Sequence, residues 1–336
     1  MRLLVTGGAG FIGSAFVRDA ISRRAWAEVL VLDALTYAGN LDNLAPVSAM
    51  PGFGFERADI RDRQVTAAAF DRFRPDVVVN FAAESHVDRS ILSPEDSVST
   101  NVLGTASLLD AARECPPGVF VQVSTDEVYG SVEDPLLADE RRPLRPSSPY
   151  SASKAGSDLL ALAYGQTFSL PVVVTRASNN YGPYQFPEKL IPLMISNALE
   201  GVPLPVYGDG LQVRDWLHVS DHCRAINAVI DRGRLGQAYN VGGGCRLRNL
   251  DVVRRILRLC GRPESLVERV PDRPAHDRRY ALDSSKIEAD TGWVPEREFE
   301  AGLRETVRWY RENREWVERV RSGEYRRYYE RNYSRR

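Results

Sequence analysis

The sequence has few cysteines and histidines, and neither kind of residue is clustered. Its four cysteines and four histidines are scattered through 336 residues, and no Cys-x-x-Cys pair occurs. A disulfide framework, or a metal site built from these residues, needs them at short and regular spacing. The sequence therefore predicts neither disulfides nor a metal ion.

The sequence also lacks a charge imbalance and a long apolar run. Its net charge of −1 implies no general attraction to nucleic acid or to an anionic membrane. No apolar run approaches the roughly 20 residues that span a bilayer, and the chain starts with a strand and a glycine-rich turn rather than a signal peptide. The arginine-rich C-terminal segment also contains Glu and Tyr, which is typical of a solvated helical end. We expect a cytoplasmic protein that binds neither nucleic acid nor membrane.

A glycine-rich turn stands between a strand and a helix near the start of the chain. Leu3–Thr6 is apolar, and Gly7, Gly10 and Gly13 follow at a spacing of three residues. Such a turn lets backbone amides and a helix N-terminus approach a pyrophosphate. Asp33 ends a second apolar strand about 20 residues later, where a carboxylate binds ribose hydroxyls and repels a 2′-phosphate. We predict NAD binding in preference to NADP; the alternative is a purely structural strand–turn–helix.

Strands and helices alternate through the first half of the chain. Further strands are expected at 53–57, 76–80, 119–123 and 172–174, and helices at 62–70, 94–114 and 150–168. This alternation predicts an α/β fold with a Rossmann-type doubly wound parallel sheet. The pattern becomes irregular after residue 176 or so. We therefore expect an NAD-binding domain at 1–176 and a smaller, mixed α/β substrate-binding domain at 177–336, with about 211–245 partly returning to the first domain.

The residues that carry chemistry follow the fifth expected strand. Thr125, Asp126 and Glu127 come at its carboxyl end, where doubly wound sheets bind their ligands. Tyr150 and Lys154 are four residues apart and share one face of a helix. An ammonium beside a phenol favours the phenolate, so we expect the tyrosine pKa to lie below its usual value of about 10. The alternative is a loop cap beside an ordinary helix face.

Together these motifs resemble the extended short-chain dehydrogenases/reductases. Stretches at 82–90, 124–130, 178–184, 187–192 and 272–277 are similar to the dTDP-glucose 4,6-dehydratase family, and the similarity runs through nearly the whole chain. The Thr-Asp-Glu triplet discriminates best, because the related sugar-nucleotide epimerases lack paired acids there. Two residues depart from the family pattern: Ala275 replaces a common glycine, and Cys245 replaces a residue that is usually polar.

The resemblance implies a lyase that acts on dTDP-glucose for deoxysugar biosynthesis. The sugar is oxidised at C4, loses water across C5–C6 and regains the hydride at C6, so NAD stays bound throughout. Tyr150, with Lys154, takes the proton of the 4-hydroxyl, and Thr125 binds the same oxygen. Glu127 is the base at C5, and Asp126 is the acid that protonates the departing C6 hydroxyl. The alternatives are another NDP-sugar 4,6-dehydratase, a sugar-nucleotide 4-epimerase or decarboxylase, or a non-catalytic NAD-binding regulator.

The resemblance also implies two sets of contacts. The cofactor set contains Gly7, Gly10, Phe11, Ile12, Gly13, Asp33, Thr36, Asp59, Ile60, Phe81, Ala82, Ala83, Ser85, Thr100, Tyr150, Lys154 and Asn180. The substrate set contains Ser85, Thr125, Asn179, Glu188, Lys189, Leu190, Pro205, Tyr207, Arg214, Asn249, Arg273 and His276. A nucleoside diphosphate needs cations, which Lys189, Arg214 and Arg273 supply, and Tyr207 would pack against its base.

Two expected helices are apolar over more of their circumference than one face of a sheet can bury. The helix that follows Pro94 carries Val98, Val102, Leu103, Leu108 and Leu109, and the helix of Tyr150 carries Leu159, Leu160, Leu162 and Ala163. An exposed apolar patch of this kind usually marks an interface. We predict a homodimer built on a four-helix bundle, as the resemblance also implies; the alternative is that the substrate-binding domain covers the extra face.

Overall fold

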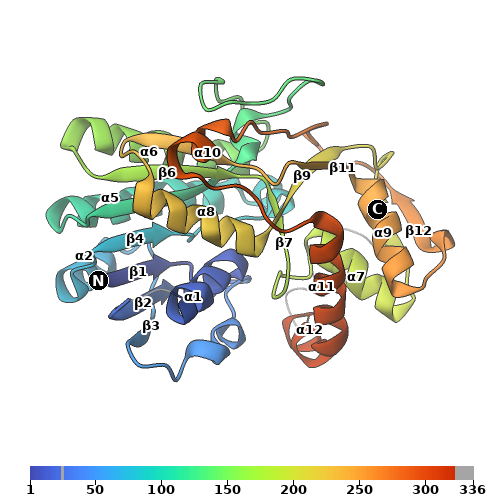
Figure 1. Cartoon of the computed structure of the whole chain (residues 1–336), viewed down its shortest axis with the longest axis horizontal. Coiled ribbons are helices and arrows are strands. Elements are labelled where there is room, and N and C mark those ends of the chain that lie inside the picture. The colour runs from blue at the N-terminus through green and yellow to red at the C-terminus, as the bar shows by residue number, and fades with distance from the viewer. Residues whose placement is uncertain (24–25, 322–336) are drawn as a thin grey trace.

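A seven-stranded parallel sheet forms the centre of the protein, as a computed structural model of residues 1–23 and 26–321 shows (Figure 1). The strands are β1 (Arg2–Thr6), β2 (Glu28–Asp33), β3 (Phe53–Arg57), β4 (Val77–Asn80), β5 (Val119–Thr125), β6 (Val172–Ala177) and β10 (Gln237–Val241). Their order across the sheet is β10-β6-β5-β4-β1-β2-β3, which confirms the predicted doubly wound architecture. The arginine-rich end after residue 321 lies outside the described residues.

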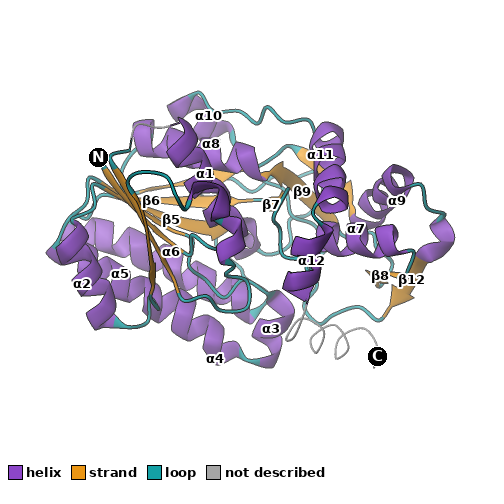
Figure 2. Ribbon diagram, turned by 90° about the horizontal axis from the view of Figure 1, so that it is seen from below, coloured by secondary structure: helices purple, strands orange, loops and turns teal. Residues whose placement is uncertain are grey.

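Helices cover both faces of this sheet because its strands are apolar on both sides (Figure 2). In β1, Leu3 and Val5 belong to one core cluster with Phe16, whereas Leu4 belongs to another with Phe70. The helices of the first face are α1 (Phe11–Arg23) and α8 (Val219–Arg232); those of the second are α2 (Arg63–Phe73), α5 (Thr105–Glu114) and α6 (Pro149–Phe168). The later part of the chain thus adds α8 and β10 to the sheet.

The rest of the chain builds a smaller region beside the carboxyl ends of these strands (Figure 1). Its strands are β7 (Asn179–Tyr181), β9 (Val213–His218) and β11 (Cys245–Arg248) in one sheet, and β8 (Leu204–Tyr207) and β12 (Val267–Val270) in another. Its helices are α7 (Leu190–Glu200), α9 (Asn249–Cys260), α11 (Phe299–Glu312) and α12 (Arg314–Arg321), and α10 (Ser285–Thr291) packs on α8 and β10. Trp216, Ile195 and Leu303 lie in the core of this region.

The segment expected as one helix at 94–114 is divided into three parts. α4 (Pro94–Ser97) leads into a π-helical turn, η3 (Val98–Gly104), and then into α5. A π-helical turn is wider than an α-helical one and occurs often at functional sites. Here it carries the buried Asn101, whose side chain accepts from Glu84 N at 2.8 Å and donates to Ser153 Oγ at 2.8 Å. The turn therefore joins the loop after β4 to α6.

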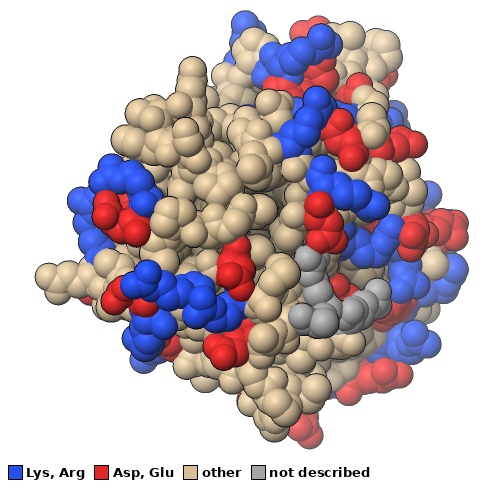
Figure 3. Space-filling view, turned by 60° about the vertical axis from the view of Figure 1, so that its left-hand side comes forward, with Lys and Arg blue, Asp and Glu red and all other residues tan. Residues whose placement is uncertain are grey.

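The predicted apolar patch on these helices is only partly correct. Leu108 and Leu109 are fully buried in the core cluster beneath α5, because that side of the helix packs on the sheet and on α2. Val98, Leu103 and Leu159 are 46%, 61% and 58% exposed, so a smaller apolar face remains. On the face that Figure 3 shows, acidic and basic side chains lie beside one another in several places. Within the described residues, every helix is too short or too polar to cross a membrane.

The remaining short elements are α3 (Val87–Leu92) and the 3₁₀ turns η1 (Leu41–Asn43), η2 (Ala45–Val47), η4 (Asp126–Tyr129) and η5 (Glu264–Leu266). Three of them position the site. η1 lies beside the glycine-rich turn, α3 follows the end of β4, and η4 follows β5 directly. The functional residues are therefore placed by loops at one edge of the sheet, where the strands themselves are rigid and buried.

Candidate active site

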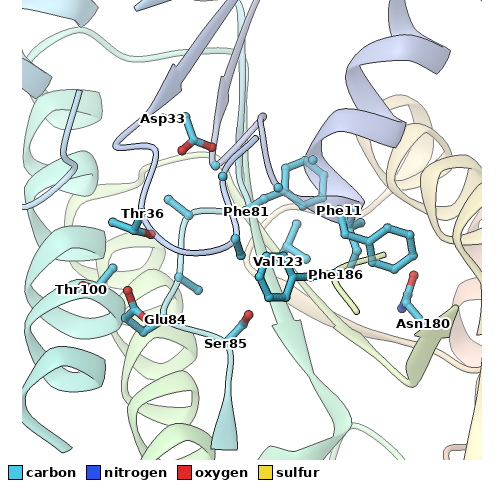
Figure 4. A pocket seen from close by; sticks show the side chains of 18 of the residues that line it. Phe11, Asp33, Thr36, Phe81, Glu84, Ser85, Thr100, Val123, Asn180 and Phe186 are labelled. Carbon is cyan, nitrogen blue, oxygen red and sulfur yellow. The ribbon is translucent and has the colours of Figure 1, made fainter. Parts of the chain in front are cut away.

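A cavity of about 300 Å³ lies at the carboxyl ends of the parallel strands. All residues with a predicted cofactor contact line it, together with Thr125, Asp126, Glu127, Asn179, Glu188 and Lys189. Figure 4 shows Asp33 at one end of the view and Ser85 at the other, with Phe81 and Val123 between them. The fold thus brings the predicted dinucleotide residues and the predicted catalytic residues into one continuous space.

The glycine-rich turn is shaped by close contacts between backbones. Gly7 has a φ of +68°, and a Cβ on it would lie 2.5 Å from Ala82 N. A Cβ on Gly13 would lie 2.3 Å from Gly7 O. Because α1 begins at Phe11, its first amide groups lack carbonyl partners within the helix and lie where Phe11 and Ile12 line the cavity. This end of the cavity suits the diphosphate of a dinucleotide.

Asp33 connects the end of β2 to this turn. Its Oδ2 accepts from Ala9 N at 2.9 Å and its Oδ1 accepts from Leu35 N at 2.8 Å. Burial raises the pKa of this carboxyl, and the two backbone hydrogen bonds oppose that rise. Each carboxylate oxygen accepts more than one hydrogen bond, so Asp33 can still bind a ribose diol while it holds the turn.

The residues that carry the hydroxyl, the phenol and the ammonium of the predicted catalytic set line the same cavity. Thr125 ends β5 and Tyr150 lies in the first turn of α6, and both residues line the cavity. Lys154, one helical turn further on, is buried and donates from Nζ to Val123 O at 2.6 Å. Ser148 caps the N-terminus of α6 and so fixes where the helix begins.

Asp126 and Glu127 differ in their surroundings. Burial, and then the charge of Glu127, raise the pKa of Asp126 well above its usual value; within the described residues its Oδ2 has no hydrogen-bond partner. Burial also raises the pKa of Glu127, but Arg273, Arg214 and Lys189 all oppose that rise. The three cations near Glu127 thus favour its ionised form, whereas burial and the charge of Glu127 disfavour ionisation of Asp126.

The expected lowering of the Tyr150 pKa is wrong for the protein by itself. Burial raises the pKa of the phenol, and the neighbouring Glu127 and Asp126 raise it further. Burial lowers the pKa of Lys154 to about 8, against the attraction of Asp158. The spacing of four residues places both side chains on one face of α6, yet it does not reveal the effect of the two acids of η4 on the phenol.

Lys189 and Glu188 bring the smaller region to the cavity. Lys189 donates from Nζ to Ser85 O at 2.8 Å. The carboxylate of Glu188 lies 3.7 Å from His86 Nε2 and 3.9 Å from Arg89 Nε, and burial raises its pKa to about 7. Residues of the loop after β4 therefore face residues of the loop before α7 across the cavity.

Three other predicted substrate residues gather behind the cavity. Asp88 accepts from Tyr207 Oη at 3.1 Å and from Arg273 Nη1 at 3.3 Å. The His276 ring lies 6.1 Å from that of Tyr207, and its Nδ1 is 2.6 Å from Asp272 Oδ1. The φ of +53° at Ala275 is a conformation that favours glycine, which explains why this departure from the family pattern is unusual.

The last four predicted substrate residues are spread more widely. Arg214, in β9, donates to Asp277 O at 2.9 Å and lies 4.2 Å from the ring of Tyr280. Leu190 begins α7, Pro205 lies in β8, and Asn249 begins α9 with its N donating to Gln212 O. These residues, like Tyr207, Arg273 and His276, fall outside the lining of the described cavity.

Several side chains at the site were not predicted from the sequence. The cavity lining also contains Tyr37, Asn43, Glu84, Phe186, His222 and Trp316. Tyr37 and Glu84 are sequence neighbours of predicted contacts, and so is Asp88, which binds Tyr207 and Arg273. Their positions in the sequence could therefore have indicated that they belong to the site. Trp316 lies far from every other lining residue in the sequence, and only the tertiary structure places it there.

Comparisons with known proteins agree with this geometry. The model of the family described as GDP-mannose 4,6 dehydratase matches residues 4–306. The chain is similar to a probable dTDP-glucose 4,6-dehydratase of Sinorhizobium fredii, with 52% identity over 97% of each chain. It is also similar to the structure of a dTDP-glucose 4,6-dehydratase from Streptomyces venezuelae with NAD and TYD bound, with a TM-score of 0.92, 53% identity, and 95% of this chain and 100% of that chain covered.

A solved UDP-glucose 4-epimerase shares the fold at lower identity. That protein, from Thermus thermophilus and in complex with NAD, is 36% identical, with a TM-score of 0.86 and coverage of 93% of this chain and 100% of that chain. The similarity to an epimerase agrees with the shared sheet and dinucleotide turn. The identity to the two dehydratases, 52% and 53%, is higher than that to the epimerase.

Proposed function

Because the chain belongs to the dTDP-glucose 4,6-dehydratase family, we propose that it converts dTDP-glucose to dTDP-4-keto-6-deoxyglucose as an NAD-dependent hydro-lyase. The observation that carries this proposal is the pair Asp126 and Glu127. The two acids adjoin Thr125 and Tyr150 in one buried site, and their surroundings favour different protonation states. A water elimination needs both forms at once: one carboxylate to take a proton and one carboxylic acid to give one.

The first task of the site is to remove the proton of the 4-hydroxyl. Tyr150 is the group placed for this step, and Thr125 lines the same part of the cavity, next to Asp126 and Glu127. Since burial and the acids raise the pKa of Tyr150, the phenolate depends on nearby positive charge. Lys154, on the same face of α6, is the protein group that supplies it.

The elimination step divides the work between the two acids. The ketone at C4 acidifies the proton at C5, which Glu127 takes as a general base. The electron pair of the C5–H bond forms the C5–C6 double bond, and the C6–O bond breaks. Asp126 gives its proton to the departing oxygen, so water leaves rather than hydroxide. Arg273, Arg214 and Lys189 stabilise the ionised Glu127 at the start of this step.

The residues at the glycine-rich end fit NAD. The close packing at Gly7 and Gly13, the amide groups at the start of α1 and the buried Asp33 form a cradle for a diphosphate and a ribose. NAD, when bound, supplies the acceptor for the hydride from C4, the donor of the hydride to C6, and a positive ring charge. Asp33 would repel the 2′-phosphate of NADP, so titration of the cofactor-free protein should show far tighter binding of NAD.

The nucleoside diphosphate of the substrate would bind on the side of the smaller region. Arg214 and Arg273 supply positive charge close to Glu127, and Lys189 supplies it at the cavity. Tyr207 and His276 give the aromatic surface that a base requires. We assign residues 177–336 mainly to substrate binding, with about 211–245 partly returning to the NAD-binding domain of residues 1–176. Glu188, Asn179, Leu190, Pro205 and Asn249 complete this side.

We further propose that the enzyme is a cytoplasmic homodimer. The exposed apolar residues Val98, Leu103 and Leu159 lie on neighbouring helices, since η3 packs on α6. Two copies of this face would form a four-helix bundle, which buries the apolar surface that each chain exposes alone.

The test is incubation of the purified protein with dTDP-glucose and no added cofactor, followed by NMR of the product. A methyl signal at C6 and loss of the C4 proton are expected. Conversion to a C4 epimer with an intact CH₂OH group would contradict the dehydratase and favour a 4-epimerase. Parallel incubation with UDP-glucose separates a dTDP-glucose enzyme from another NDP-sugar 4,6-dehydratase.

A further inference from the structure

The C-terminal helix reaches the glycine-rich side of the cavity from the far end of the chain. In α12, Trp316 is 6% exposed and lines the cavity. Its Nε1 donates to Asn43 Oδ1 at 3.1 Å, across 273 residues of sequence. Figures 1 and 2 show α12 on the side of the smaller region that faces α1. Trp316 therefore connects the two regions at the dinucleotide end of the site.

Asn43 connects Trp316 to the glycine-rich turn by hydrogen bonds. The Asn43 side chain is 2% exposed, and its Nδ2 donates to Ala9 O at 2.9 Å. The same carbonyl accepts from Asn40 N at 3.1 Å, and the carbonyl of Asn43 accepts from Arg18 Nη1. Ala9 lies between the glycines of the turn, and its N–H donates to Asp33. A single chain of hydrogen bonds thus runs from Trp316 to the turn that would hold the diphosphate.

A second contact crosses the same boundary beside the first. The guanidinium of Arg18, in α1, lies 4.2 Å from the centre of the Tyr184 ring. On its other sides Tyr184 packs against Trp309 and Trp316, with ring centres 4.5 and 5.9 Å away. Tyr184 has a φ of +67°, a strained conformation for an aromatic residue. Such a conformation persists only where neighbouring groups hold it.

We propose that Trp316 is a positioning residue for the dinucleotide: through Asn43 and Tyr184 it fixes the glycine-rich turn and keeps bound NAD from dissociating between the two halves of the reaction. This inference rests on the proposed function, because a redox-neutral dehydratase must end each turnover with the same NAD molecule. Since Trp316 and Tyr184 both line the cavity, their contacts also close the dinucleotide end. A loosened turn would let NAD leave more often.

The test is the rate at which the holoenzyme exchanges its bound NAD for labelled NAD in the absence of substrate. Trp316→Phe keeps an aromatic side chain but removes the indole N–H. The buried Asn43 Oδ1 then loses the hydrogen bond that it accepts from Trp316. We expect NAD exchange to become about tenfold faster, the change that corresponds to one lost buried hydrogen bond. Arg18→Met keeps the apolar stem but removes both the charge over Tyr184 and the hydrogen bond to Asn43 O, and it should accelerate exchange by about threefold.

Trp293→Phe is the matched control. Trp293 is also buried, at 4% exposure, and its Nε1 donates to Asp221 O at 3.1 Å, away from the cavity lining. Trp293→Phe should lower the midpoint of urea unfolding as much as Trp316→Phe does, and it should leave the rate of NAD exchange unchanged. Wild-type exchange in both Trp316→Phe and Arg18→Met, or equal acceleration in Trp293→Phe, would overturn the inference. A wild-type protein that binds no NAD would contradict the proposed function as well.

Discussion

The two sides of the cavity are built in different ways. On the dinucleotide side the backbone forms the surface: Gly7 and Gly13 allow contacts that a single added carbon would block, and Asp33 is fixed by two backbone amides. On the acid side the surface is a cluster of buried charges, in which Glu127 faces Arg273 and Arg214. One side is defined by close packing, and the other by electrostatic balance.

This difference predicts how each side fails. A backbone cradle accepts its ligand or excludes it, largely independently of pH, because steric overlap does not titrate. A cluster of buried charges changes by degrees, since each charge shifts the pKa of its neighbours and so moves the pH at which the site works. Substitutions on the two sides should therefore differ in kind as well as in size.

The largest effect is expected at Glu127. Glu127→Gln keeps the shape of the side chain but removes the base for C5, so product formation should fall by about 10²–10⁴-fold. The 4-ketone should still form, and the absorbance of reduced cofactor should appear in a single turnover without 6-deoxy product. When the reaction is run in deuterium oxide, substrate recovered from the variant should carry no deuterium at C5.

Asp126→Asn is the matched comparison, because it changes the neighbouring acid in the same pocket. It should also lose product, but deuterium should enter C5 while water elimination stalls. If both variants exchange C5 equally, the division of roles between Asp126 and Glu127 is wrong.

The next effect is expected in the glycine-rich turn. A Cβ at position 13 would overlap the carbonyl of Gly7, so Gly13→Ala should weaken NAD binding by roughly ten- to a hundredfold, equally at pH 6 and pH 8. Gly118→Ala is the control, since its nearest neighbour, Asp76 O, would be 3.3 Å away and far from the turn. Isothermal titration of cofactor-free protein measures both. If the loss of NAD affinity in Gly13→Ala differed between pH 6 and pH 8, the dinucleotide side would also depend on titrating groups, which would contradict the proposed difference between the two sides.

The side built from backbone was the easier one to predict from the sequence. Its strands, its glycine spacing and Asp33 lie within one continuous stretch, where periodicity and turn chemistry act locally. The triplet after β5 and the Tyr150–Lys154 pair were equally visible, because a strand end and a helical turn fix them. All of these residues line the cavity.

The remaining features depend on contacts between distant segments. The role of Asp88 requires Tyr207 and Arg273 to reach it from positions more than 100 residues away. The raised pKa of Tyr150 depends on its burial and on two acids of another element, η4. Leu108 was expected to be exposed, because an amphipathic pattern does not show that α2 and the sheet cover that side of α5. Tertiary packing decided each of these outcomes.

A smaller effect, and one that depends on pH, is expected at Arg273. Burial raises the pKa of Glu127 and Arg273 lowers it, so Arg273→Gln should raise that pKa. Glu127 must be ionised to act as the base, so the acidic limb of the kcat profile should move to higher pH. Profiles of kcat at saturating dTDP-glucose measure the shift.

Arg278→Gln is the control for Arg273. Arg278 is exposed and pairs with Asp209 at 2.8 Å, so its loss should leave the profile in place. A variant of Arg273 that raises KM without moving the acidic limb would show that this arginine only binds substrate. The charge of Arg273 would then have less effect on the pKa of Glu127 than the structure indicates.

The smallest effect on catalysis is expected outside the cavity, where neither side is touched. Leu103 is 61% exposed on η3, and Leu103→Glu would bring a charge into the proposed dimer face. We expect light scattering to show the mass of one chain instead of two, while activity per chain changes by no more than about twofold, because all the proposed catalytic residues belong to one chain.

Leu136→Glu is the control for Leu103→Glu. Leu136 is 54% exposed in the loop between η4 and α6, and the Leu136→Glu variant should stay dimeric. A wild-type protein with the mass of one chain would contradict the dimer, and a large loss of activity in Leu103→Glu would show that the dimer helps to hold α6, and with it Tyr150, in place.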